Sequence, residues 1–215
     1  MDKARQHMVR NQLAPNQITS AALLQAFCTV PREQFIPHKD VKAPYIDAAI
    51  EIGEDRFLLA PLILAKLINY SELLPSSNVL IIGGGTGYGA AIFSHLCNMV
   101  FVVESNPVLF KHLITNINKG EYLNIVPHKG PLTAGFPKSA PYDHIFVLGG
   151  VEFIPAALLS QLKSTGSLLT ICYFKPHFSQ IVKFTPLTGE SPHTIFEWGD
   201  APILPDFVLQ KEFIL

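Results

Sequence analysis

A glycine-dense turn and a single carboxylate form the part of this sequence best suited to chemistry. The glycines follow the apolar run 79–82 directly and are Gly83, Gly84, Gly85, Gly87 and Gly89. Glu104 follows a second apolar run, residues 99–103. Glycines let a nucleotide-like ligand approach the backbone, and a carboxylate at the end of the second strand can hold ribose hydroxyls. The stretch therefore predicts a strand–loop–helix–strand unit that binds such a ligand; the alternative is a tight turn without one.

The glycine spacing favours one cofactor over another. A nicotinamide motif starting at Gly83 requires glycine or alanine at its sixth position, which is Tyr88, and the match that starts at Gly85 begins two residues late. The spacing Gly83-x-Gly85-x-Gly87 is more similar to the first motif of class I S-adenosylmethionine-dependent methyltransferases. We therefore expect S-adenosyl-L-methionine as the cofactor. Its expected contacts are Gly83, Gly85, Thr86, Gly87 and Glu104.

The bulk composition limits the possible partners. With 215 residues, 48% of them hydrophobic and 15% charged, the chain fits one domain around a buried sheet. A net charge of −1 argues against a nucleic-acid substrate held through its phosphates. We expect no membrane span and no metal site, because long apolar runs and metal-ligand spacings are lacking. Three cysteines, an odd number, indicate free thiols and a cytoplasmic protein.

The expected elements place the glycine turn in an α/β doubly wound sheet. Two helices, over residues 2–13 and about 20–29, precede an irregular stretch at 40–57 and form an amino-terminal helical cap. The core strands are expected at 79–82, 99–103, 124–128, 145–148 and 168–174, with helices at 61–70, 107–119 and 155–163. The proline-rich tail shows two weak strand candidates, near 180–185 and 207–214.

Several short motifs outside the glycine turn resemble the protein-L-isoaspartate O-methyltransferase family. They are Val-Pro-Arg-Glu at 30–33, Phe-Ile-Pro at 35–37, Ile52-Gly53 followed by Pro61, Pro-Tyr-Asp at 141–143, and Gln161-Leu162 with Gly166. The resemblance implies a class I methyltransferase (Rossmann-like) sheet and protein repair by carboxyl methylation of isoaspartyl residues. It divides one domain into a cap and substrate-side segment at 1–60, a cofactor-binding core at 61–175 and a tail at 176–215 that completes the sheet.

This sequence departs from the family pattern at three places. Leu59 occupies the position of a serine whose hydroxyl lies at the family's methyl-transfer site, and a leucine neither donates nor accepts a hydrogen bond. Pro131 replaces an aspartate that meets the adenine amino group in the family. Ile81 stands near the strand end where the family has an acid. Glu104 is the acidic cofactor contact that clearly remains.

Arg56 is the candidate substrate residue, because a guanidinium can clamp the carboxylate of a substrate. The alternative is a solvated surface arginine. The leading hypothesis is thus an S-adenosylmethionine-dependent methyltransferase acting on isoaspartyl protein or peptide. A divergent methyltransferase with a small or apolar acceptor would suit Phe57, Leu58 and Leu59. A member of the fold that has lost catalysis and acts as a binding module is the third hypothesis.

Overall fold

The computed structural model describes residues 2–37, 43–186, 191–192 and 194–209. A seven-stranded sheet in the order β5-β4-β3-β6-β7-β8-β9 forms its centre. The strands are β3 (Asn78–Ile82), β4 (Met99–Glu104), β5 (Ile125–Lys129), β6 (Tyr142–Val151), β7 (Leu162–Lys175), β8 (Phe178–Phe184) and β9 (Thr194–Trp198). The first five strands of that order from β5 to β7 are parallel, whereas β8 and β9 are added antiparallel. This arrangement confirms the α/β doubly wound class.

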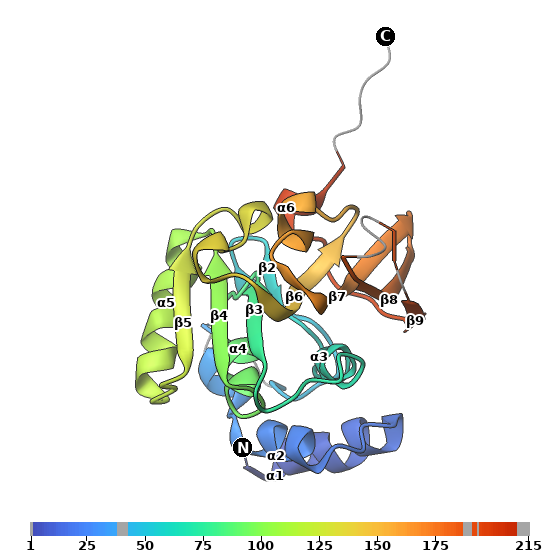
Figure 1. The fold of residues 1–215 in the computed structure, drawn as a ribbon. Helices are drawn as coiled ribbons and strands as arrows, with labels where there is room; N and C mark the ends of the chain where they lie inside the picture. Colours follow the sequence, from blue (N-terminus) through green and yellow to red (C-terminus); the bar gives the residue numbers. More distant parts are fainter. Residues whose placement is uncertain (1, 38–42, 187–190, 193, 210–215) are drawn as a thin grey trace.

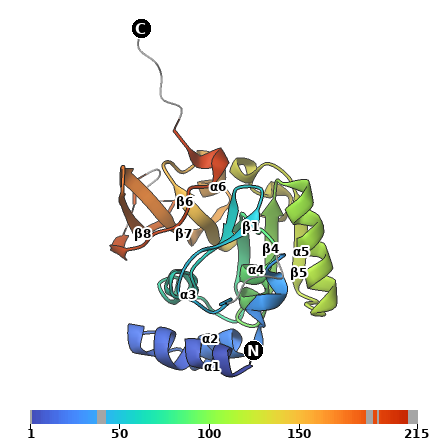
Figure 2. The ribbon, with the colours of Figure 1, turned by 180° about the vertical axis from the view of Figure 1, so that it is seen from behind.

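Helices pack around the sheet and at its amino-terminal side (Figures 1 and 2). They are α1 (Asp2–Met8), α2 (Ala21–Thr29), α3 (Pro61–Asn69), α4 (Tyr88–Ser94), α5 (Pro107–Lys119) and α6 (Ala156–Leu159). A π-helical turn, Val9–Leu13, continues α1. Helix α1 lies beside α2 in both views, so the amino-terminal helices form a layer of their own. The helical cap is therefore present as predicted.

The sheet is buried on both faces because its central strands are almost entirely apolar. Val79 and Ile81 of β3 point into one hydrophobic core, together with residues of α3, α4 and α5. Leu80 and Ile82 alternate with them and point into a second core on the opposite face. Ile81 is fully buried, so the position where the family has an acid serves packing in this chain.

Three element predictions need correction. The stretch 40–57 contains a two-stranded antiparallel sheet of β1 (Ile50–Gly53) and β2 (Arg56–Leu58), where no regular structure was expected. The helix expected over 155–163 is only α6, because β7 already begins at Leu162. Strand β8 confirms the first tail candidate, near 180–185. Strand β9 lies where no strand was expected. Of the second candidate, 207–214, residues 207–209 form no strand and 210–214 lie outside the described residues.

His144 on β6 gives the fold a predictable acid sensitivity. Its Nδ1 lies 3.0 Å from Ser167 Oγ. Burial lowers the pKa of His144 to about 4, although the negative charge of Asp143 acts to raise it. As the pH falls, His144 of the unfolded chain binds a proton near pH 6.5, whereas His144 of the folded chain binds one only near pH 4. The free energy of unfolding should fall by about 2 kcal/mol as pH drops from 6.5 to 4.

Urea unfolding of a His144→Gln variant across this pH range measures the contribution. The variant should show a smaller pH slope, because glutamine does not titrate. His112→Gln, which changes an exposed histidine, should keep the slope of the unmodified protein. An unchanged slope in His144→Gln would contradict the assignment.

Candidate cofactor site

The glycine loop begins where β3 ends, at the carboxyl edge of the parallel sheet. Gly83, Gly85 and Gly87 have φ angles of 79°, 54° and 99°, in the left-handed region that glycine adopts without a side-chain clash. The N–H groups of Gly83 and Gly84 donate to the Val103 carbonyl at 3.0 and 3.1 Å. These bonds hold the loop against the end of β4 and therefore next to Glu104.

Glu104 is fully buried, and its carboxylate receives four hydrogen bonds. Oε1 accepts from Arg56 Nη1 at 2.8 Å and from the Asn106 N–H at 3.0 Å. Oε2 accepts from Arg56 Nη2 at 3.1 Å and from the Gly85 N–H at 2.7 Å. A carboxylate has about four lone-pair sites. Glu104 therefore lies beside the glycine loop as predicted, but its acceptor capacity is used within the chain.

Arg56 lies on β2, and its side chain is 5% exposed. It is therefore not a solvated surface arginine. Both of its terminal nitrogens donate to Glu104, which makes the pair a bidentate ion pair. The two residues are 48 positions apart in the sequence. Sequence reasoning identified each residue separately and missed the pair, because no local spacing connects them.

Thr86 and Tyr88 pack inward from the glycine loop. Thr86 is buried, and its hydroxyl donates to the Phe35 carbonyl at 2.5 Å. Its carbonyl accepts from Asn116 Nδ2 at 2.9 Å. The Tyr88 ring meets Phe35 edge-on with the centroids 5.6 Å apart. The loop is thus tied to the 3-10 turn Arg32–Phe35, which brings the Val-Pro-Arg-Glu motif next to the site.

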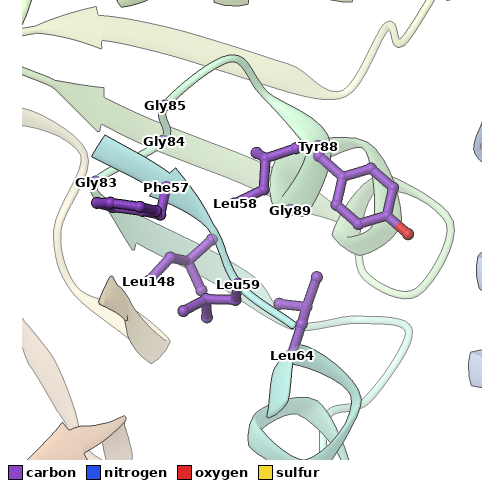
Figure 3. Close-up of a pocket in the computed structure, with 10 residues that line it drawn as sticks. All are labelled: Phe57, Leu58, Leu59, Leu64, Gly83, Gly84, Gly85, Tyr88, Gly89 and Leu148. Atoms are coloured by element: carbon purple, nitrogen blue, oxygen red, sulfur yellow. The ribbon is translucent and has the colours of Figure 1, made fainter. Parts of the chain in front are cut away.

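Leu59 lines a small inner cavity of about 20 Å³ beneath the glycine loop. Figure 3 shows that the side chains of Phe57, Leu59, Leu64 and Leu148 gather around it. The Tyr88 hydroxyl points away from these side chains (Figure 3). On the side of this cavity, the position of the family's serine therefore faces aliphatic and aromatic side chains, whereas a second space of about 10 Å³ lies between Leu59 and Arg56.

Arg32 is a fully buried cation next to Tyr88. Its guanidinium carbon lies 4.9 Å from the centroid of the Tyr88 ring, and burial lowers the pKa of Arg32. Burial raises the pKa of Tyr88 to about 12, against the effect of the Arg32 charge. In the described part of the chain, the guanidinium nitrogens and the Tyr88 hydroxyl have no hydrogen-bond partner. The contact between Arg32 and Tyr88 thus depends on the ring face.

Replacing Tyr88 by phenylalanine should leave the free energy of unfolding unchanged or raise it by up to about 1 kcal/mol. The reason is that an unpaired buried hydroxyl is removed while the ring beneath Arg32 is kept. Chemical denaturation of Tyr88→Phe and Tyr88→Leu measures the change in the free energy of unfolding, and only the leucine variant should be clearly destabilised. A loss of more than about 1 kcal/mol in Tyr88→Phe would show that the hydroxyl is paired.

The histidines and cysteines that the structure describes are of residue types that can serve as metal ligands. Within the described ranges, no group of three histidine, cysteine, aspartate or glutamate side chains is arranged to hold a metal ion. His128 stacks on Phe136 with the centroids 4.2 Å apart. Cys28, Cys97 and Cys172 are free thiols. No helix in the described part of the chain is both long and apolar enough to cross a membrane.

The sheet order, with the glycine loop at the end of β3 and an acid at the end of β4, defines a class I methyltransferase fold. The model of the protein-L-isoaspartate(D-aspartate) O-methyltransferase (PCMT) family matches residues 3–184. The chain belongs to this family, which confirms the resemblance seen in the sequence.

Individual relatives agree with this assignment. A protein-L-isoaspartate O-methyltransferase from Opitutus terrae is 34% identical over 189 residues, which cover 88% of this chain and 81% of the relative. Protein-L-isoaspartate O-methyltransferase 2 from Marinobacter nauticus is 32% identical over 201 residues, which cover 94% and 91%.

Two solved structures share the fold. A protein-L-isoaspartate O-methyltransferase superimposes with a TM-score of 0.77 at 23% identity, covering 94% of this chain and 66% of that chain. A Plasmodium falciparum protein of the PCMT type, in complex with S-adenosyl-L-homocysteine, gives 0.74 at 20% identity, covering 92% and 97%.

The family implies a bound S-adenosylmethionine, but the described conformation leaves no room for it beside the glycine loop. Three separate spaces of about 20, 10 and 160 Å³ lie around the glycine loop, Arg56 and Asn106, and we call them together the crevice. Ligand pockets usually measure about 300–1,000 Å³. In addition, Glu104 has no acceptor left for ribose hydroxyls. The residues present therefore do not fit the cofactor in this conformation.

Proposed function

We propose that this protein is an S-adenosylmethionine-dependent methyltransferase that methylates carboxylates, with isoaspartyl residues of damaged proteins or peptides as acceptors. The observation that carries the proposal is the match of residues 3–184 to the PCMT family. The buried acid beside the glycine loop supports it, because Glu104 stands where an adenosyl ribose would be recognised. The proposal requires a conformation in which the crevice is open.

Methylation of an acceptor carboxylate requires few catalytic groups from this chain. The carboxylate is already anionic at neutral pH, so it needs alignment more than a general base. Leu59 therefore does not forbid the reaction, although it supplies no hydrogen bond for alignment. Clamping of the acceptor by Arg56 remains part of the proposal, and it requires Arg56 to leave Glu104. Arg56 would then pair with the Glu104 carboxylate in the closed site and with the acceptor carboxylate in the open site.

A methyltransferase with a small apolar acceptor is the second candidate. The observation that favours it is the inner cavity, whose side chains Phe57, Leu59, Leu64 and Leu148 offer no polar atom. A carboxylate placed against these side chains would lose its hydration without gaining a hydrogen bond from them. An apolar acceptor would not have this cost.

Transfer of labelled methyl groups to a synthetic peptide tests the leading proposal. The peptide should carry one isoaspartyl residue, and the control peptide should carry ordinary aspartate at the same position. We expect base-labile incorporation into the isoaspartyl peptide only. Absence of incorporation by folded protein at saturating S-adenosylmethionine would reject isoaspartate as the acceptor. Leu59→Ser, which restores the family's hydroxyl, should increase incorporation if alignment limits the rate.

A further inference from the structure

The segment 201–207 lies across the end of β6, at the carboxyl edge of the sheet. The Gly150 N–H donates to the Pro202 carbonyl at 2.9 Å, and the Leu204 N–H donates to the Gly150 carbonyl at 3.0 Å. The Glu152 N–H donates to the Phe207 carbonyl at 2.9 Å. In Figures 1 and 2, this red part of the chain returns to the sheet near α6. We call residues 201–207 the strap.

The strap places Leu204 directly on the glycines that border the crevice. The Leu204 side chain is buried, and its Cγ lies 2.5 Å from where a Cβ on Gly149 would be. Its Cδ1 lies 3.2 Å from the corresponding point on Gly83. A leucine of the same chain therefore fills the space left by the missing side chains of Gly149 and of Gly83, and Gly83 is one of the predicted cofactor contacts.

Arg56 occupies the same space at Gly83. Its Nη2 lies 3.0 Å from the Cβ position of Gly83, and the guanidinium holds Glu104. Arg56 and Leu204 both border a remaining space of about 10 Å³. The largest remnant, about 160 Å³, borders the closure as well, because Arg56 and the strap residues Pro205 and Asp206 line it together with Asn106 and Leu132.

The strap also lies outside residues 3–184, the part of the chain that matches the family model. The glycine loop and Glu104 therefore belong to the matched part, whereas Leu204 does not. A segment beyond the matched part thus occupies the space that the glycine loop borders.

From these contacts, we propose that the strap and Arg56 form an internal closure of the adenosyl site. S-adenosylmethionine can then bind only when Leu204 leaves Gly83 and Gly149 and Arg56 releases Glu104. The closure rests on the proposed function, because it assumes an adenosyl ligand. If the closure exists, the position of the strap determines the affinity for the cofactor.

Titration calorimetry with S-adenosylhomocysteine tests the closure. Leu204→Ala shortens the side chain over the glycines and should tighten binding at least tenfold relative to the unmodified full chain. Leu123→Ala is the matched control, because Leu123 is 95% exposed and should bind like the unmodified protein. Circular dichroism checks that each variant is folded.

The possible results separate the closure from the proposed function. If the unmodified protein and Leu204→Ala bind equally well, the closure is overturned and the proposed function stands. If neither these proteins nor the double variant Arg56→Ala/Leu204→Ala binds while folded, both fail.

Hydrogen exchange on the unmodified protein provides a test that needs no variant. A saturating concentration of S-adenosylhomocysteine should accelerate exchange at the Gly150 and Leu204 amides, because the bonds of the strap must open. Unchanged or slower exchange at both amides, under conditions where calorimetry shows binding, would overturn the closure.

Discussion

Replacing Glu104 by glutamine should lower the free energy of unfolding by about 3–5 kcal/mol, because one partner of a buried ion pair is removed. Arg56 would keep its charge at 5% exposure with a neutral amide in place of its carboxylate. The amide also has one oxygen instead of two. It cannot accept from Arg56, Gly85 and Asn106 as the carboxylate does.

Urea denaturation of Glu104→Gln measures this loss directly. The matched control is Glu51→Gln, which changes an exposed glutamate on β1 and should stay within about 0.5 kcal/mol of the unmodified protein. The double variant Arg56→Leu/Glu104→Leu should recover much of the loss, because apolar residues of similar volume often replace a buried pair without cost. A loss below about 1 kcal/mol in Glu104→Gln would show that the pair is exposed in solution.

Replacing Gly84 by alanine should cost about 2–3 kcal/mol through overpacking. A Cβ at this position would lie 2.3 Å from Val102 Cγ2 and 2.8 Å from Leu113 Cδ1. Val102 and Leu113 are both fully buried, so neither side chain can move without disturbing the core between β4 and α5. Gly84 is therefore required for packing rather than for a positive φ angle.

Thermal and urea unfolding of Gly84→Ala measure this cost, with Gly130→Ala as the control. A Cβ at Gly130 would lie 2.8 Å from Nε2 of His128, whose partly exposed ring can slide along Phe136 by the few tenths of an ångström that are needed. The control should therefore lose less than about 1 kcal/mol. Equal losses in both variants would contradict the packing role of Gly84.

The parts of the fold with strong local signals were predicted from the sequence. Helix α5 occurs over Pro107–Lys119 as expected, because Asn106 caps it and Pro107 fits its first turn. Strands β3 and β4 were found because their apolar runs are continuous and lead into the glycines and Glu104. Such signals depend only on neighbouring residues.

The features that close the site were not predicted, because they depend on contacts between distant residues. The hairpin of β1 and β2 is short: the alternation of buried Ile50 and Ile52 with exposed Glu51 covers only three residues, and β2 has three residues in all. The pairing of Arg56 with Glu104 and the docking of Leu204 on Gly149 have no local spacing that would reveal them. The position of the glycine loop was predicted correctly, but whether the space beside it is open or closed depends on these distant contacts.

Of the predicted cofactor contacts, Thr86 shows most clearly why residue type alone is insufficient. Its hydroxyl could serve a ligand, but it donates to the Phe35 carbonyl and lies fully buried. A role of Thr86 in cofactor binding remains a prediction that this contact does not support. Its contribution to the site in the described conformation is to fix the loop against the 3-10 turn Arg32–Phe35.

The most direct test of an adenosyl site at the glycine loop is an amide NMR titration of the unmodified protein. S-adenosylhomocysteine is the ligand, and NAD is the control. We predict that the Gly85 and Asn106 signals shift with S-adenosylhomocysteine and not with NAD, because both amides donate to Glu104. NMR detects this binding even when closure makes it weak. Unmoved signals at millimolar S-adenosylhomocysteine, or shifts with NAD alone, would contradict the assignment of this loop to an adenosylmethionine-type cofactor.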